Sequence, residues 1–203
     1  MQVNSLHMKL KFLHLVLAAV ALPLVTVHAN AQLGIYGTIN AERASGVACK
    51  DAPLPCSYND GVDRAIGGGG GVYYQWKQMG PALLGVDVRG DIYKSNKSAS
   101  SVLSGQNAFR MDEALGGIRA SFSADKGFLT PYAEALFGWN RRDRTDNFFA
   151  YRVVGGLDVN LLPIMAVRIP EVGIGQNIGM GSVKSNTVES VSVGVVFHTR
   201  RDR

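Results

Sequence analysis

Apolar and polar residues alternate with period two in one segment of this chain after another, and this alternation limits the folds open to it. Such a pattern predicts strands with one apolar face and one polar face. No stretch after Gln32 shows a helical period or an apolar run of about 18 residues, the length that would indicate a spanning helix. We expect eight strands, at residues 33–45, 71–79, 82–94, 109–123, 129–141, 148–161, 165–179 and 188–200.

The connections between these segments differ at the two ends of the expected sheet. At one end they are long or polar, at residues 46–70, 95–108, 142–147 and 180–187, and at the other they are tighter, at 80–81, 124–127 and 162–164. Long outer loops and short periplasmic turns are typical of outer-membrane barrels, in which closure leaves no unpaired strand edge in lipid. We therefore predict an all-β fold, an eight-stranded antiparallel up-and-down transmembrane β-barrel.

Two local features depart from regular alternation. Pro170 interrupts the seventh segment, and because proline has no N–H to donate to a ladder, we expect a β-bulge there. The glycine run 67–71 has no following Lys-Ser/Thr or helix, as a phosphate loop would require, and we interpret it as a flexible entry into the second strand.

The N-terminal segment has the features of a secretory signal. Lys9 and Lys11 precede the apolar stretch 12–27, and residues 29–31 (Ala-Asn-Ala) match a small-residue cleavage site. We expect a signal peptide over 1–31, cleaved after Ala31, and a barrel domain over 32–203, with Met1 or Met8 as the start. The alternative, a membrane anchor, is disfavoured because the apolar stretch is short of the ~20 residues that span a bilayer.

With these features the chain resembles the small eight-stranded outer-membrane barrels of the OmpA/OmpX and opacity-protein type, over about residues 33–200. Its last strand is similar to the C-terminal assembly signal of such barrels, through Gly194 and the aromatic Phe197, which six residues follow. The resemblance implies an outer-membrane location, contact with membrane lipid and lipopolysaccharide, and insertion by the barrel-assembly machinery.

The polar face carries charge on nearly every strand, and in a barrel it would face the lumen. An eight-stranded barrel is just wide enough for side chains to fill it, and opposite charges withdrawn from water must pair. We expect a lumen plugged by ion pairs, with a narrow, weakly cation-selective pathway as the alternative. The expected network is Glu42, Lys77, Asp87, Arg89, Asp91, Glu113, Arg119, Glu134, Arg152, Asp158, Arg168 and Glu171.

Composition argues against most catalytic and nucleic-acid functions. Of four histidines, only His198 lies outside the expected leader, and Ser192 is too far along the strand from it for direct contact. Loss of the leader lowers the net charge from +5 to +3, and no basic face with stacking aromatics indicates nucleic-acid binding. We expect no enzyme activity, no catalytic residue, no metal and no cofactor.

We therefore expect any recognition of a ligand to occur in the loops, which are the usual site of binding on a rigid scaffold. Cys49 and Cys56 are expected to form a disulfide in the first loop, because paired cysteines in an exported chain usually oxidise. Arg141, Arg142 and Arg144 are candidates to contact lipopolysaccharide phosphates. We expect a structural or surface-interaction role, adhesin-like, in which the loops bind an extracellular ligand. The alternatives are a small porin-like channel and a soluble lipocalin-like carrier with its apolar face inward.

Overall fold

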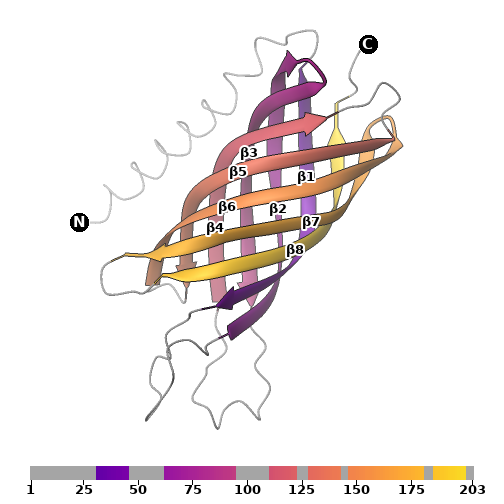
Figure 1. Cartoon of the computed structure of the whole chain (residues 1–203). Coiled ribbons are helices and arrows are strands. Elements are labelled where there is room, and N and C mark those ends of the chain that lie inside the picture. The colour runs from indigo at the N-terminus through magenta and orange to yellow at the C-terminus, as the bar shows by residue number, and fades with distance from the viewer. Residues whose placement is uncertain are drawn as a thin grey trace, which may run out of the picture.

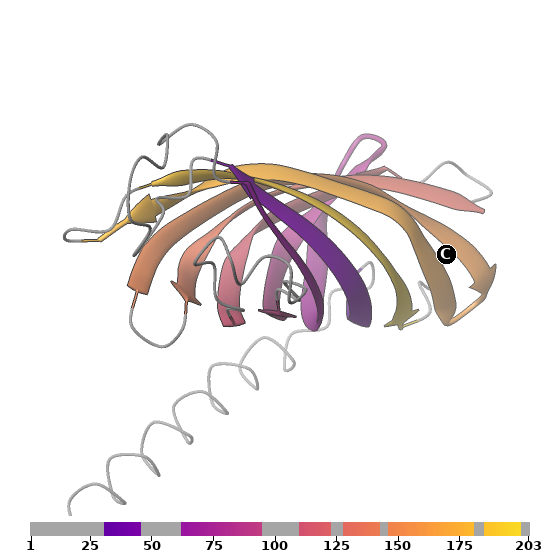
Figure 2. The ribbon, with the colours of Figure 1, turned by 90° about the horizontal axis from the view of Figure 1, so that it is seen from below.

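Eight antiparallel strands form a closed barrel in the computed structural model, which describes residues 31–45, 62–94, 110–122, 128–142, 146–180 and 185–199. Each strand pairs with the next in sequence order, and β8 pairs with β1 to close the barrel. Figure 1 shows the strands running obliquely side by side, and in Figure 2 they follow one another around a curved wall. The strands are β1 (Gln32–Ser45), β2 (Val62–Met79), β3 (Ala82–Lys94), β4 (Arg110–Phe122), β5 (Leu129–Arg142), β6 (Asp146–Leu162), β7 (Met165–Gly179) and β8 (Asn186–His198).

The predicted fold class and the predicted strand number are therefore confirmed. The barrel turns its polar face inward and its apolar face outward, the reverse of a soluble domain. Ile39 and Ile118 have 68% and 67% of their surface exposed, whereas Asp87 and Arg168 have 0%. This inversion follows from the alternation of side chains across each strand, which sends every second residue into the lumen. No helix in the described part of the chain is long and apolar enough to cross a membrane.

The second strand is longer than the sequence predicted, because β2 begins at Val62 and includes the whole glycine run. Residues 67–71 pair with β1 on one side and with β3 on the other, so the interpretation of this run as a flexible entry was wrong. A Cβ atom at Gly69 would collide with the Asp91 side chain, and one at Gly71 with the Tyr36 hydroxyl. The glycines leave the inner face of β2 bare so that side chains of β1 and β3 can lie across it.

The bulge expected at Pro170 is present. The pairing of β7 with β8 shifts between Arg168 and Glu171, where three steps along β7 match two along β8, from Gly194 to Ser192. The additional residue breaks the alternation once, so that both Arg168 and Glu171 are buried in the lumen. Without the bulge, two residues three apart would point to opposite faces.

Candidate functional site in the barrel lumen

Three arginines and four carboxylates from β3 to β7 form one connected set of ion pairs in the lumen, which we call the central cluster. Arg89 pairs with Glu134 and, at 2.8 Å, with Glu171. Arg119 pairs with Glu134 and, at 2.9 Å, with Asp158. Every charge in the set therefore has a partner of opposite sign, and all but Asp87 have one on another strand. The central cluster comprises Asp87, Arg89, Arg119, Glu134, Asp158, Arg168 and Glu171.

Arg168 connects the two halves of the central cluster. Its Nε lies 2.9 Å from Oδ1 of Asp158, and its Nη1 lies 3.2 Å from Oε2 of Glu171. The guanidinium group also lies over the rings of Tyr36 and Tyr132, 4.3 and 4.5 Å from their centroids. Stacking on aromatic faces stabilises a desolvated cation while its N–H groups remain directed at carboxylates.

The strands that contribute no charge to the central cluster contribute hydrogen bonds or ring contacts to it. The Tyr36 hydroxyl of β1 donates to Asp87 at 2.7 Å, and the Ser192 hydroxyl of β8 donates to Glu171 at 2.9 Å. The Tyr73 ring of β2 lies 4.4 Å from the Arg119 guanidinium carbon. All eight strands are thus tied together through the lumen.

A second group, the loop-end cluster, lies nearer the end of the barrel where β1 and β2 meet the long first connection. It contains Asn40, Glu42, Asp91, Glu113, Asn140, Arg152 and Asn177, all buried. Arg152 pairs with Glu113 at 2.5 Å and is the basic residue of the cluster. Asp91 accepts a hydrogen bond from the Asn40 amide at 2.5 Å. Three carboxylates facing one guanidinium group make this part of the lumen acidic.

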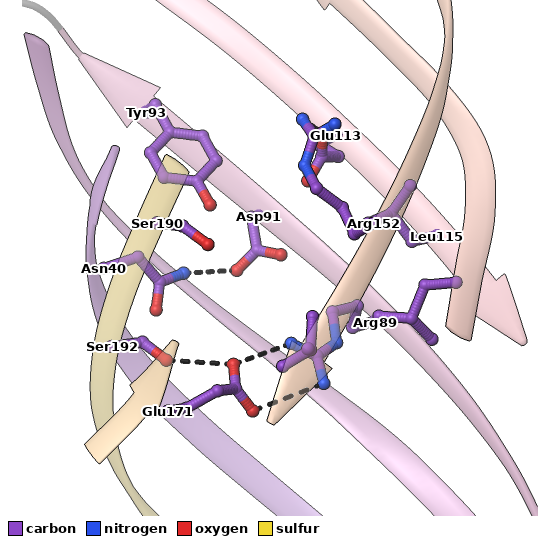
Figure 3. A pocket seen from close by; sticks show the side chains of 12 residues that line it. Asn40, Arg89, Asp91, Tyr93, Glu113, Leu115, Arg152, Glu171, Ser190 and Ser192 are labelled. Carbon is purple, nitrogen blue, oxygen red and sulfur yellow. Dashed lines mark hydrogen bonds and ion pairs between the residues drawn. The ribbon is translucent and has the colours of Figure 1, made fainter. Parts of the chain in front are cut away.

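A cavity of about 20 Å³ lies between the two clusters. Figure 3 shows Arg89 and Glu171 of the central cluster on one side of it and Asp91, Glu113 and Arg152 of the loop-end cluster on the other. This volume accommodates about one water molecule. Between the two clusters, the described side chains therefore leave room for about one water molecule.

The structure buries eleven of the twelve charged residues that the alternation assigned to the lumen, seven of them acidic and four basic. Lys77 is the exception, and its placement in the lumen was wrong: its side chain is exposed near the β2–β3 turn. The pairing of β2 with β3 shifts between Gln75 and Lys77, so Trp76 is an additional residue there. Gln75 is the buried residue at this end, and alternation past the bulge no longer predicts the inner face.

The remaining predicted residues lie elsewhere. Arg141 is on the outer face of β5, 3.8 Å from Asp112, and Arg142 ends the same strand opposite Asp146. Phe197 is 56% exposed on β8, and Gly194 pairs with Thr38 of β1. The expected signal peptide up to residue 30, Arg144, and the cysteines Cys49 and Cys56 lie outside the described residues.

The tyrosines and asparagines of the lumen were not singled out from the sequence. Tyr36, Tyr73 and Tyr132 are 5%, 3% and 4% exposed and contact the arginines, while Asn140 donates to Glu113 at 3.0 Å. Each shares the parity of the charged residues on its strand. That parity is the signal that could have found them, since a polar group buried with charges needs hydrogen-bond partners.

The described residues contain no group of three or more His, Cys, Asp or Glu that could hold a metal ion. His198 lies at the end of β8, where its ring nitrogen is 3.4 Å from the Thr199 carbonyl oxygen. Ser192 lies on the same strand, is buried in the lumen, and donates its hydroxyl hydrogen to Glu171. The buried charges of the described lumen pair with one another.

A closed up-and-down barrel with charges inside and apolar residues outside has the fold of the small eight-stranded outer-membrane barrels. No protein-family model matches the chain, and no curated protein matches its sequence. Neisserial surface protein A is similar in structure, with a TM-score of 0.57 and 16% identity over 81% of this chain and 96% of that one. The outer membrane enzyme PagL is also similar, with a TM-score of 0.51 and 12% identity over 81% and 98%. The resemblance to the OmpA/OmpX type is thus confirmed for the fold.

Proposed function

We propose that this protein is an outer-membrane barrel whose lumen is closed by its ion pairs and whose role is structural or surface-interacting, adhesin-like, through the loops at one end. The observation that carries the proposal is the connected lumen network, joined from all eight strands by ion pairs, hydrogen bonds and ring contacts. A barrel filled in this way is a rigid support for loops, which are the usual site of recognition.

The outer face supports insertion in a membrane. On β3, apolar residues continue from Ala82 to Ile92, ten residues along the strand. At about 3.3 Å per residue and a tilt of about 40°, they cover about 25 Å along the membrane normal, the height of the apolar band of outer-membrane barrels. A soluble lipocalin-like carrier would need this face turned inward, and the described strands turn it outward.

The lumen supports closure over conduction. Removing one member of a buried ion pair leaves an uncompensated charge and costs about 3–5 kcal/mol, so the paired side chains will not swing aside readily. The cavity between the clusters, of about 20 Å³, holds no more than about one water molecule.

A narrow cation pathway is the second candidate, favoured by one observation. The buried lumen residues contain seven carboxylates and four guanidinium groups, and Oε2 of Glu42 and Oδ1 of Asn40 have no hydrogen-bond partner among the described residues. Rings of carboxylates are the usual basis of cation selectivity.

Planar bilayer recording separates the two candidates. The refolded mature chain is reconstituted, and folding is verified by a gel mobility that shifts on boiling. A silent bilayer is the expected result. Reproducible, long-lived steps would refute the closed lumen; the variant Glu42→Gln/Asp91→Asn should then lose cation selectivity if the acidic cluster determines it.

We also propose that the barrel-assembly machinery inserts the chain through the β8 signal at Gly194 and Phe197, and that Arg141, Arg142 and Arg144 contact lipopolysaccharide. Replacing these three arginines with glutamine should lower lipopolysaccharide retention after purification. Unchanged retention would exclude them as contacts.

A further inference from the structure

Among the described residues, the exposed charges are distributed unequally between the two ends of the barrel. At the end of the β2–β3 turn, Lys77 is the only exposed charged side chain among the described residues. At the opposite end, basic residues continue across the outer faces of neighbouring strands. This basic arc consists of Arg43 on β1, Arg64 on β2, Lys94 on β3 and Arg110 on β4.

Like charges in the basic arc lie directly opposite each other in the strand register. Arg43 pairs with Arg64, and Lys94 pairs with Arg110. Lys94 is opposite Ile66, two residues from Arg64, so the two pairs are diagonal neighbours. Side chains directly opposite on antiparallel strands have Cβ atoms about 5 Å apart, and like charges there destabilise the sheet. An anion between the members of each pair would turn this repulsion into attraction.

Among the described residues, acidic side chains neutralise only the margins of the basic arc. Glu189 on β8 pairs with Arg43 at 3.1 Å, and Asp112 pairs with Arg110 at 2.8 Å. Arg64 and Lys94, in the middle of the arc, make no ion pair with the described residues. The centre of the arc therefore carries two exposed basic side chains that have no acidic partner among the described residues.

From this placement we propose that the basic arc binds the headgroup of an anionic lipid that carries two phosphates, such as lipid A, in the leaflet at the loop end. One phosphate lies between Arg43 and Arg64, and the other lies between Lys94 and Arg110. The centres of these pairs are two strand spacings apart, about 10 Å. Arginine donates to phosphate in bidentate fashion, and each such bond is charge-assisted.

A lipid fits the arc better than a soluble polyanion because the apolar band begins immediately beside it. Ile66 and Ile92, 70% and 47% exposed, are the next outward residues on β2 and β3. Acyl chains lying on that band would bring their phosphates to the level of the arc. The site rests on the proposed membrane insertion and gives the lipid a position on β1 to β4, apart from Arg141 and Arg142 on β5.

The test is lipid retention by the folded full-length barrel in detergent, measured by native mass spectrometry during titration with lipid A. Arg64→Gln/Lys94→Gln should weaken binding about tenfold, and Asp112→Asn/Glu189→Gln should strengthen it. Lys77→Gln at the opposite end is the control and should leave binding unchanged. Monophosphoryl lipid A should bind more weakly than the diphosphorylated form.

Three results would overturn the site: equal lipid A retention by the wild type and Arg64→Gln/Lys94→Gln, equal loss in the Lys77→Gln control, or complete displacement of lipid A by millimolar inorganic pyrophosphate. Folding of each variant is checked by the boiling shift and by insertion into phosphatidylcholine vesicles. Failure of the wild type in those two assays would instead refute the membrane barrel itself.

Discussion

The Arg152–Glu113 ion pair gives the sharpest test of the lumen network. Arg152 lies 2.5 Å from the Glu113 carboxylate, and both side chains are 3% exposed. Arg152 also donates to Oδ1 of Asn177 at 2.9 Å. Among the ion pairs of the described lumen, Glu113 has this one guanidinium partner, whereas Glu171 of the central cluster pairs with both Arg89 and Arg168.

Arg152→Met keeps a long apolar stem but removes the charge and the donors. A buried carboxylate left without its cation costs about 3–5 kcal/mol. Asn140 still donates to Glu113 at 3.0 Å, so we expect the lower end of that range, a loss of about 3 kcal/mol. Glu113→Gln alone should cost less, about 1–2 kcal/mol, because Arg152 retains Asn177 and backbone carbonyl partners.

The double variant Arg152→Met/Glu113→Gln removes both charges, so its loss should be smaller than the sum of the single losses by about 2 kcal/mol. Equilibrium unfolding in urea, with the barrel in lipid vesicles, measures all three free energies of unfolding. Trp76 and Trp139 are 40% and 52% exposed on the outer face and provide the fluorescence signal. A coupling energy below about 0.5 kcal/mol would refute the argument that this pair stabilises the lumen.

Three further predictions concern the two faces of the barrel and are measured by the same unfolding assay. Gly117→Ala places a Cβ against a backbone carbonyl of the neighbouring strand and should cost about 1–3 kcal/mol, whereas Gly37→Ala, with its nearest atom at 3.9 Å, should cost much less. Ile118→Arg, on the middle of the outer face, should cost about 2–4 kcal/mol, and Phe122→Arg at the strand end about 0–1 kcal/mol; equal costs would contradict the membrane position of this face. Lys77→Gln should change stability by less than about 0.5 kcal/mol, and a larger loss would mean that Lys77 does belong to the network.

The sequence was sufficient to predict the number of strands and which face of each strand is polar, because both depend on local alternation. Residues 82–94, for example, form β3 with the predicted bounds. The second strand was predicted too short because glycine contributes no side chain to an alternating pattern, so residues 67–71 carried no signal of either face. Glycine is required at Gly69 and Gly71 because the side chains of Asp91 and Tyr36, on the neighbouring strands, occupy the space that a Cβ atom would take.

The partners within the lumen could not be predicted from alternation. Arg89 and Glu171 are 82 residues apart and meet because the stagger of four consecutive strand pairs, from β3 to β7, brings them to one level. Each bulge alters that stagger by one residue, and an error at Gln75 was enough to misplace Lys77. Parity determines which face a residue occupies, but contacts across a barrel depend on the accumulated register of all the strands between them.

The bulge at Pro170 shows how register and lumen charge depend on each other. A one-residue slip moves every side chain of a strand to the other face. In regular β-structure, Arg168 and Glu171 would point to opposite faces, and one of these charges would meet lipid at a cost of about 2–4 kcal/mol. The additional residue brings both inward, where they pair at 3.2 Å, and proline suits a position where ladder pairing is interrupted. The ion pairs therefore stabilise the bulge, and the bulge in turn places the two charges that join Asp158 to Arg89 across the lumen.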